Sequence, residues 1–350
     1  MIELLDTTSA AIASEFVRAR RNAGSPAMGM IMTLIIVADE ASSEEAMRVG
    51  RSAAREHPAR ILGLMLNSPR GQSRVDARVG IGSGITGERA LIELTGEVVK
   101  HPESVVLPLL LPDSPVVIWW AGNAPANPTA DPLGALATRR ITDAASMRTA
   151  KGRAMLNQCS SYAPGNTDLA WTRITGWRAL LAAALDQHPG KVLSATVVAE
   201  RVSPSADLLS AWLADRLRVD VSRRNSDGPG ITDVVLNTQH GDISLVRYDG
   251  KLATLSSPGQ PDRPVALKRR GLDELLSEEL RRLDPDDVYA ATARRMVKLA
   301  EDGKLKTSKR ASGGKATRRS KKSAQAHDAT AESAKETAKA TAGQTAGEGA

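Results

Sequence analysis

The sequence is poor in cysteine and in aromatic residues. Its single cysteine, Cys159, excludes an internal disulfide and a zinc site built from several thiolates, and it fits a reducing compartment. Only five Trp, three Tyr and one Phe occur in 350 residues. Ala, Leu, Val and Ile must therefore fill most of the core, and each Trp position has to be weighed as core or as binding surface.

The sequence also lacks a secretory signal and a membrane-spanning run. Its first residues, MIELLDTTSAAIASEF, carry Glu and Asp where a signal peptide carries positive charge followed by a long apolar stretch. The longest apolar runs, around MGMIMTLIIVA and VVLPLLLP, are too short to cross a bilayer. We therefore expect a soluble cytoplasmic protein with no membrane partner.

The common catalytic motifs are absent as well. There is no HExxH pair, no Walker A loop and no GxSxG elbow. The segment GSGITG at 82–87 matches GxGxxG, but the next residues read as a strand rather than a helix, so we favour a flexible hairpin loop over a dinucleotide site. His57, His101 and His188 each precede a proline, which favours helix terminators over catalytic or metal-binding groups. We expect a protein that is not an enzyme and needs no cofactor or metal.

Net positive charge is confined to the C-terminal tail. Residues 304–350 hold 11 Lys or Arg and 4 Asp or Glu, whereas residues 1–303 hold 36 of each sign. The tail has no aromatic residue and one Leu, so it cannot offset an ordering cost of about 1–2 kcal/mol per residue. We expect a disordered tail that makes at most weak, salt-sensitive contact with polyanions, because it has no side chains for stacking bases.

The length and the element pattern predict two domains, over 1–160 and 161–303, of the α/β class in its broad α+β sense. Residues 30–66 read as strand, helix and strand, a βαβ unit with parallel strands, whose helix begins at a capping box of Ser42 and Glu45. The first domain is expected to be a mixed sheet with flanking helices. Its other expected elements are a helix over 6–23, strands over 73–81 and 89–96, a short helix before a strand ending at Trp119 and Trp120, and mostly helix over 131–160.

The pattern changes after SSYAPGNTD, where the second domain is expected to begin. Three alternating runs, ITDVVLNT, ISLVRY and KLATLSS, predict a meandering sheet, and Asp249-Gly250 between the last two predicts a hairpin. The flanking elements expected are a helix over 167–187, a strand over 191–199, a helix over 204–218 capped by Ser203, a further strand at PVALKR, and helices over 271–283 and 285–301, the last capped by Asp284.

The helix expected over 167–187 has one face of large and one of small residues. Trp177 lies in the middle of the large apolar stripe, so we expect it in the core. Small residues let another backbone come close, so we expect this helix to be packed on both sides. The small residues are Thr172, Gly176, Ala179 and Ala183.

Trp171, Trp119 and Trp120 are harder to assign. Trp171 lies on the flank of the same helix beside Arg178, and Trp with Arg commonly anchors interfaces, so an interdomain or partner contact is as well supported as a place in the core. Trp119 and Trp120 end a strand and point to opposite faces. We favour core for both, with contact to a helix, a second domain or a partner as the alternative.

Several longer stretches resemble the OpcA family, the glucose-6-phosphate dehydrogenase assembly proteins of bacteria. Together they are specific, and they are spread over nearly all of residues 1–303. At position 166, where we expect Asp in the family, this chain has Asn166, which caps a helix nearly as well. The stretches are REHPARI at 55–61, LPLLLPDSPVVIWW at 107–120, DPLGALATRRITDAA at 131–145, YAPGNTDLAWTRITGWRALLAAALD at 162–186 and LDPDDVY at 283–289.

The resemblance implies a non-catalytic protein that binds glucose-6-phosphate dehydrogenase and promotes its active oligomer in the oxidative pentose phosphate pathway. Some members are regulated by cysteine oxidation, but Cys159 alone excludes an internal disulfide switch. The alternative hypothesis is a sugar-phosphate- or nucleotide-binding domain or enzyme. The residues expected to bind the partner, chosen by type and position within the similar stretches, are Trp171, Arg173, Arg178, Arg139, Arg140, Asp143 and Trp120.

Overall fold

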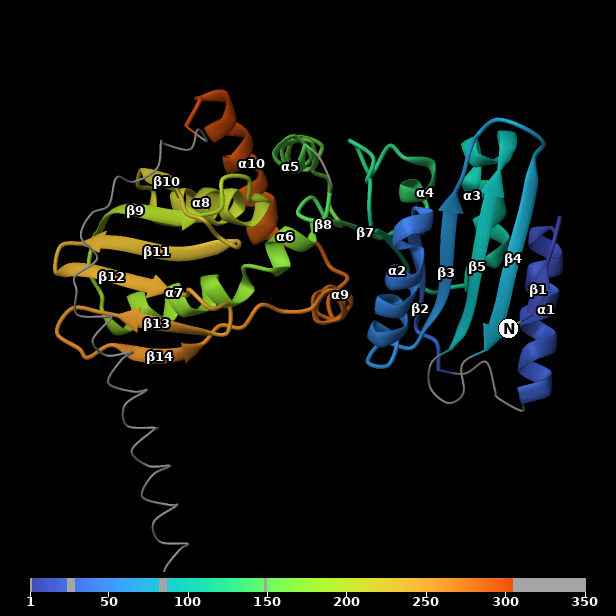
Figure 1. Ribbon diagram of the computed structural model, residues 1–350, viewed down its shortest axis with the longest axis horizontal. Coiled ribbons are helices and arrows are strands. Elements are labelled where there is room, and N and C mark those ends of the chain that lie inside the picture. The colour runs from blue at the N-terminus through green and yellow to red at the C-terminus, as the bar shows by residue number, and fades with distance from the viewer. Residues whose placement is uncertain (1, 24–28, 82–86, 148–149, 305–350) are drawn as a thin grey trace, which may run out of the picture. The chain divides into compact units, whose positions relative to one another are not determined.

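The computed structural model describes residues 2–23, 29–81, 87–147 and 150–304. These residues form two β-sheets with flanking helices, which confirms the predicted fold class (Figure 1). Except for Gly87 and Lys304 at their edges, the GSGITG loop and the predicted basic tail lie outside the described residues.

The N-terminal sheet is mixed. Its central and later strands are parallel, and β1 and β4 run antiparallel to their neighbours. In the predicted βαβ unit, Met32 lies opposite Ala59 and Ala38 opposite Met65, so its strands are parallel as expected. In the order of the sheet, the strands are β1 (Ile2–Leu4), β4 (Arg74–Ile81), β5 (Glu88–Thr95), β3 (Ala59–Leu66), β2 (Met32–Ala38), β6 (Val116–Trp120), β7 (Arg139–Thr142) and β8 (Asn166–Asp168).

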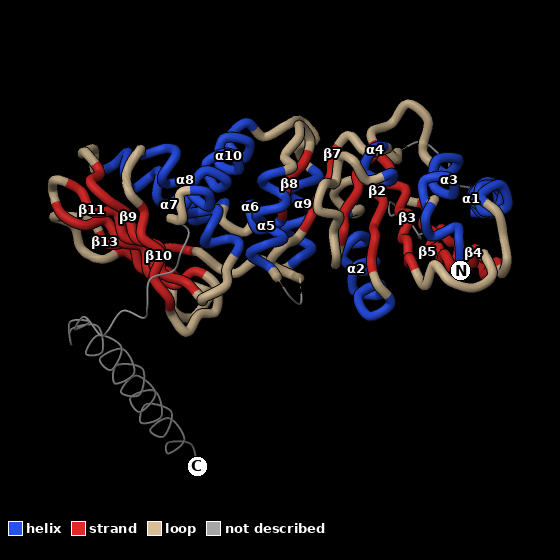
Figure 2. Tube along the Cα trace, turned by 90° about the horizontal axis from the view of Figure 1, so that it is seen from above, coloured by secondary structure: helices blue, strands red, loops and turns tan. Residues whose placement is uncertain are grey.

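Helices cover both faces of this sheet. Figure 2 shows α1 and α3 on one side of the strands and α2 on the other. Phe16 of α1 and Leu133 of α4 belong to the apolar cluster of the first face, and Val49 of α2 belongs to that of the second. The helices are α1 (Ser9–Ala23), α2 (Glu40–Ala53), α3 (Pro102–Val106) and α4 (Pro132–Ala135), with 3₁₀ turns η1 (Gly96–Lys100) and η2 (Leu107–Leu109).

Trp119 and Trp120 are both buried at the end of β6, as favoured from the sequence. They point to opposite faces: Trp119 joins the cluster under α2, and Trp120 joins the cluster under α1 and α4. A Cβ at Gly134 of α4 would lie 3.3 Å from Cη2 of Trp120. Trp120 is therefore covered by this chain itself.

The C-terminal sheet is a meander with one parallel edge. β9 and β10 are parallel across α8, and the other neighbours are antiparallel. Figure 2 shows α7, α8 and α10 on one side of this sheet, and side chains along β13 alternate between exposed and buried. In the order of the sheet, the strands are β10 (Val221–Asn225), β9 (Val192–Ala199), β11 (Ile231–Thr238), β12 (Gly241–Val246), β13 (Leu252–Ser256) and β14 (Arg263–Ala266).

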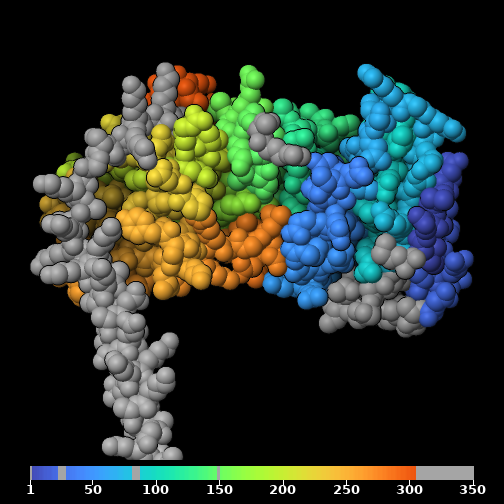
Figure 3. Space-filling model, viewed as in Figure 1, coloured from blue at the N-terminus to red at the C-terminus, as the bar shows by residue number. Residues whose placement is uncertain are grey.

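Six helices occur between residue 150 and residue 304, the last described residue, and two of them pack away from their sequence neighbours. Met155 of α5 belongs to the core of the C-terminal sheet. Leu276 of α9 packs against α2 on the N-terminal sheet, and Figure 3 shows the orange atoms of this region against the blue atoms of α2. The domain boundary at 160 remains a prediction. The helices are α5 (Lys151–Ser160), α6 (Leu169–Thr172), α7 (Thr175–Gln187), α8 (Pro204–Leu217), α9 (Leu272–Leu280) and α10 (Asp287–Glu301).

Two expected helical segments are interrupted. Residues 131–160 contain the strand β7, which pairs with β6 and β8, so the expectation of mostly helix was wrong there. Residues 167–187 begin in β8 and then form two helices, α6 and α7, that break at Arg173–Ile174. Packing on both sides of this segment was also wrong beyond its first turns, because Thr172 is buried but Ala179 and Ala183 are exposed.

The hairpin turn was predicted correctly, but the N-terminal caps of α2 and α10 were predicted at the wrong residues. The Asp249-Gly250 hairpin is present, with Gly250 at φ +74° and the Asp249 carboxylate accepting the amide of Lys251 at 2.7 Å. The cap of α2 is Asp39 rather than Ser42, and the cap of α10 is Asp286 rather than Asp284, because each carboxylate accepts an amide three residues on.

The three histidines before proline also lie at or beyond helix ends. His188 follows the last residue of α7, and His101 separates η1 from α3. His57 lies beyond the end of α2, where its Nε2 is 3.1 Å from the carbonyl of Ser277 on α9. His101 and His188 therefore lie at helix ends as interpreted, whereas α2 already ends at its cap Ala54, three residues before His57.

Candidate functional site

Trp171 is held by groups from two other parts of the chain. Its side chain is buried, with the residue 2% exposed, and its indole Nε1 donates to Oδ2 of Asp286 at 2.9 Å. The guanidinium carbon of Arg178 lies 3.6 Å from the ring centroid, and the ring of Tyr289 lies 5.6 Å away. The expected pairing of Trp171 with Arg178 is therefore present. It joins α6 and α7 to the start of α10 within this chain.

Arg178 is the cation of this group that approaches the surface. Its guanidinium Nη2 donates to Oγ1 of Thr175 at 3.3 Å. Burial lowers the pKa of Arg178 to about 10, against the opposing effect of Asp286 and nearby glutamates, so it is still charged at neutral pH. A small pocket of about 150 Å³ beside it is also lined by Trp171 and the exposed Arg282. Arg139 and Glu279 line the same small pocket. We call these two residues, together with Trp171, Arg178 and Asp286, the Trp171 cluster.

Arg139 and Glu279 form the buried ion pair of the Trp171 cluster. Nη2 of Arg139 on β7 lies 2.6 Å from Oε2 of Glu279 on α9, and Nη1 donates to the carbonyl of Asp284 at 2.9 Å. The other carboxylate oxygen of Glu279 accepts the hydroxyl of Thr172 at 2.5 Å. This pair connects the N-terminal sheet to α9 and α6, and the sequence analysis had not singled out Glu279.

Arg140 points away from this cluster, as alternate residues of a strand do. It donates to Oδ1 of Asn166 at 2.6 Å and to the carbonyls of Gly134, Ala137 and Pro164. Burial lowers its pKa. Asn166 is thus a partner of Arg140, and the helix cap for which Asn166 was considered is Asp168, whose carboxylate accepts the amide of Ala170 at 2.8 Å.

Arg173 and Asp143 form a two-pronged ion pair. The two guanidinium nitrogens lie 2.6 and 2.8 Å from the two carboxylate oxygens. The neighbouring Asp168 is completely buried, and burial, followed by the charge of Asp143, raises the pKa of Asp168 to about 6. Its carboxylate holds the hydroxyl of Thr142 at 2.6 Å. These side chains position α6 on β7 and β8.

The seven candidate partner-binding residues therefore separate into four places. The structure brings Trp171, Arg178 and Arg139 together, pairs Arg173 with Asp143, and places Arg140 and Trp120 elsewhere. Asp286, which the sequence analysis had not singled out, lies in LDPDDVY, one of the stretches similar to the family. Contact of any of these residues with a partner remains a prediction.

A larger pocket, missed from the sequence, lies at one end of the C-terminal sheet. It has a volume of about 520 Å³ and lies between α7, the start of α8 and the ends of β9, β12 and β14. We call it the basic pocket. Its basic side chains are Lys151, Arg173, Arg247, Lys268, Arg269 and Arg270, and the acidic residue among its described lining is Glu200.

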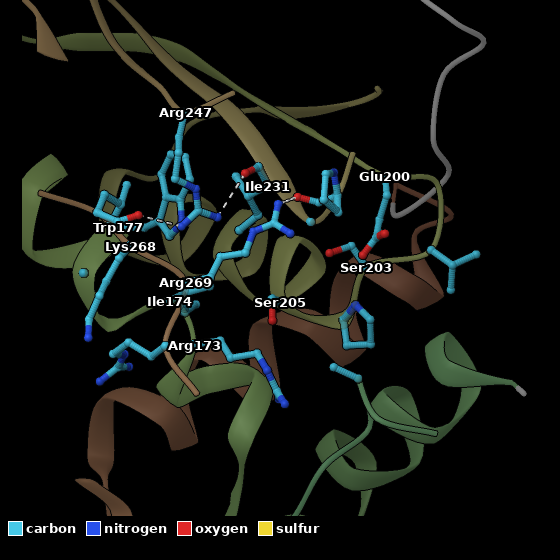
Figure 4. A pocket seen from close by; sticks show the side chains of 18 of the residues that line it. Arg173, Ile174, Trp177, Glu200, Ser203, Ser205, Ile231, Arg247, Lys268 and Arg269 are labelled. Atoms are coloured by element: carbon cyan, nitrogen blue, oxygen red, sulfur yellow. Dashed lines mark hydrogen bonds between the residues drawn. The ribbon is translucent and has the colours of Figure 1, made fainter. Parts of the chain in front are cut away.

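Arg247 forms the inner wall of the basic pocket. It is 7% exposed, donates to the carbonyls of Leu267 at 2.9 Å and Ile231 at 3.3 Å, and lies 5.0 Å from the ring centroid of Trp177. Burial, followed by the charge of Arg269, lowers the pKa of Arg247 to about 10. Figure 4 shows Arg247 and Arg269 facing the space between Trp177 and Ser203. The one sequence signal here was the short run LKRRG, which is equally typical of a solvated turn.

Other kinds of site find little support in the described residues. No group of three or more His, Cys, Asp or Glu side chains there could hold a metal ion. None of the helices there is long and apolar enough to cross a membrane. Cys159 is buried and its thiol pKa is raised by that burial, which is typical of an unreactive cysteine.

Two family models match consecutive parts of the chain. Both describe the glucose-6-phosphate dehydrogenase subunit of the OpcA family. Residues 50–160 match the model of its N-terminal domain, and residues 164–293 match the model of its C-terminal domain. No curated protein matches the chain.

Solved structures show only distant likeness. KijD10, a 3-ketoreductase from Actinomadura kijaniata in complex with NADP and TDP-benzene, is 9% identical, with a TM-score of 0.44 over 78% of this chain and 97% of its own. An oxidoreductase from Sinorhizobium meliloti is 10% identical, with a TM-score of 0.38 over 77% of this chain and 89% of its own. Likeness at this level does not bear on function.

Proposed function

The chain belongs to the OpcA family of glucose-6-phosphate dehydrogenase subunits, and from this premise we propose that it is a non-catalytic protein that binds glucose-6-phosphate dehydrogenase and promotes its active oligomer. The observation that carries the proposal is the presence of both family domains, in order, on one chain. A dehydrogenase acting at the entry to the oxidative pentose phosphate pathway is then the partner.

The mechanism that we propose is a shift in population. A bound protein raises the activity of an enzyme only if it binds the active form more tightly than the inactive form. A tenfold difference in affinity corresponds to about 1.4 kcal/mol, which a few contacts at an interface can supply. No catalytic group is required of this chain, which fits the internal use of its polar side chains.

That internal use includes residues that the sequence analysis assigned to partner binding. Arg139 and Glu279 neutralise each other in the interior, and the carboxylate of Asp168 caps α6. Arg173 is committed to Asp143. These side chains stabilise the fold, which supports a role in contact with another protein over a role in turnover.

The contact itself is proposed at the surface above the Trp171 cluster. Trp171 is buried, so it acts by positioning Arg178, which stacks on it. Arg282 lines the same small pocket and is exposed. A cation that is stacked and held in place loses little side-chain freedom on binding, and Arg is a common anchor of interfaces.

The test is to add this chain, at micromolar concentration, to purified glucose-6-phosphate dehydrogenase from the same organism. We expect a rise in activity and a shift of the dehydrogenase to a larger mass by light scattering. Arg282→Ala is expected to weaken both effects. Arg281→Ala is the matched control and should leave both effects unchanged, because the guanidinium of Arg281 lies 2.9 Å from the carboxylate of Glu56 rather than in the pocket. No change in activity or mass with the unaltered chain would refute the function, and equal behaviour of the two variants would refute the proposed surface.

The catalytic form of the alternative function, an enzyme that acts on a sugar phosphate or nucleotide, is tested with the chain alone. Steady NADP reduction with glucose 6-phosphate in the absence of any dehydrogenase, lost on changing one polar residue, would replace the proposal. The expected result is no turnover.

A further inference from the structure

The basic pocket holds more positive charge than its surroundings neutralise. Three of its six cations have a carboxylate partner: Arg173 with Asp143, Lys268 with Glu274 and Arg270 with Glu278. The other three, Lys151, Arg247 and Arg269, form no ion pair with any described residue.

Against these three cations stands Glu200. Arg247 and Arg269 instead donate to backbone carbonyls, Arg269 to that of Pro229. Among its described lining residues, the pocket is therefore left with a positive balance of two charges, which a dianion would match. Asp249, outside the lining, also acts on the charge of Arg247.

The N-terminus of α8 points into the same space. Its first turn holds Pro204 and Ser205, both of which line the pocket. Pro204 has no amide hydrogen, and the amides of Ala206 and Asp207 donate to the carbonyl of Ser203, so the amide of Ser205 is the one that this turn offers to an anion. Asp207, the carboxylate of this turn, is paired with Arg223 at 3.1 Å and does not line the pocket. The helix end is therefore not neutralised from within the pocket.

Ser205 provides an independent indication of a ligand. It is 9% exposed, yet its hydroxyl has no hydrogen-bond partner. A buried polar group without a partner costs about 1–3 kcal/mol, so native proteins rarely leave one without a reason. Figure 4 shows Ser205 in the space between Arg269 and Arg173.

We propose that the basic pocket binds a phosphorylated small molecule, with the phosphate between Ser205 at the start of α8 and the guanidinium groups of Arg247 and Arg269. A phosphate dianion accepts several hydrogen bonds, and arginine matches its geometry. It would satisfy the hydroxyl of Ser205 and balance the free cations. Glu200 keeps the phosphate on the arginine side of the pocket.

The rest of the pocket selects an organic phosphate over the inorganic ion. Ile174, Trp177 and Leu267 contribute apolar surface to its lining, against which a sugar or a base can pack. The volume of about 520 Å³ suits a ligand of sugar-phosphate or nucleotide size. The inference concerns this chain alone and does not depend on binding to the dehydrogenase.

The test is calorimetric titration of the full chain with inorganic phosphate, glucose 6-phosphate, adenosine monophosphate and, as an uncharged control, glucose. We expect at least one organic phosphate to bind more tightly than inorganic phosphate, glucose not to bind, and affinity to fall as salt is raised. Ser205→Ala should weaken binding about tenfold, the value of one hydrogen bond to a charged group, without lowering thermal stability, because no bond within the chain is lost. Arg269→Ala should weaken it at least as much.

Ser257→Ala is the matched control, because Ser257 is also 9% exposed with an unpartnered hydroxyl but lies outside the pocket. The affinity of this variant for the organic phosphates should equal that of the unaltered chain. Absence of binding by all three phosphates at millimolar concentration would overturn the proposal. So would binding that survives both pocket substitutions, because the site would then lie elsewhere. Both outcomes are measured without the dehydrogenase, so they are distinct from failure of the proposed function.

Discussion

Trp171 contributes to stability because its partners come from distant parts of the chain. It touches Arg178 on α7, and Asp286 and Tyr289 at the start of α10. Replacement by alanine leaves a cavity and an unpartnered carboxylate. We expect Trp171→Ala to lower the free energy of unfolding by about 3–5 kcal/mol, measured by urea denaturation. Tyr248→Ala, at a residue that is 76% exposed, is the control and should change it by less than about 0.5 kcal/mol.

The Arg139–Glu279 pair should behave differently from the ion pairs of the surface. Both side chains are buried, so removing one leaves an uncompensated charge in the interior. We expect Glu279→Ala to cost about 3–5 kcal/mol in unfolding free energy. Arg281→Ala breaks an exposed pair with Glu56 and should have little effect, because solvent screens such a pair. Similar losses for the two variants would contradict the buried pair.

The raised pKa of Asp168 predicts a pH dependence with a definite sign. Burial, and then Asp143, raises this pKa from the ordinary 3.8 to about 6, so the folded chain holds the proton more tightly than the unfolded chain. The contribution of Asp168 to stability is therefore fully present below about pH 4 and is lost as the pH rises through about 6. We expect the difference in unfolding free energy between the unaltered chain and Asp168→Asn to fall over this window and then to level off. A difference that rises with pH would reverse the assignment.

At the scale of elements, the long apolar runs were predictable and the short polar strands were not. β2 and β3 are buried on both faces, so their sequences are continuous runs of Ile, Leu and Met with few polar residues. β7, β8 and β10 read RRIT, NTD and VSRRN, and they are strands only because neighbours far along the chain pair with them. The spacing of apolar residues indicates which side chains are buried, but it does not indicate which strands pair.

The helix α9 is a second case in which the sequence pattern predicts an element but not what it packs against. Its apolar spacing predicted a helix, but nothing in that spacing says that it packs on α2 rather than on the sheet that precedes it. Leu276 is fully buried in this contact. We expect Leu276→Ala to cost about 2–5 kcal/mol in urea denaturation, whereas Leu107→Ala, at a residue that is 58% exposed, should cost little. Equal effects would mean that α9 is not part of the N-terminal core.

For the molecule as a whole, the candidate site was predictable in part. The pairing of Trp171 with Arg178 was expected from the geometry of one continuous helix, and it is present although the segment breaks at Arg173–Ile174. Asp286, the partner of Trp171, and Glu279, the partner of Thr172 and Arg139, lie more than a hundred residues on, so only the fold brings them together. The basic pocket was missed for the same reason: Ser205, Arg247 and Arg269 come from three separate elements. Residue types alone cannot indicate which of many arginines converge.

The exchange of helices between the two sheets also bears on how the chain folds. The family models divide near residue 160, but a fragment that ends there lacks α9, and it lacks the Glu279 partner of Arg139. The apolar surface of α2 would then face water. We expect residues 1–160 alone to bind a hydrophobic dye and to melt without a sharp transition, whereas residues 1–304 bind no dye and melt cooperatively. If the shorter fragment melts sharply and leaves the dye unbound, its sheet is stable without α9, and the boundary predicted at residue 160 separates independent folding units.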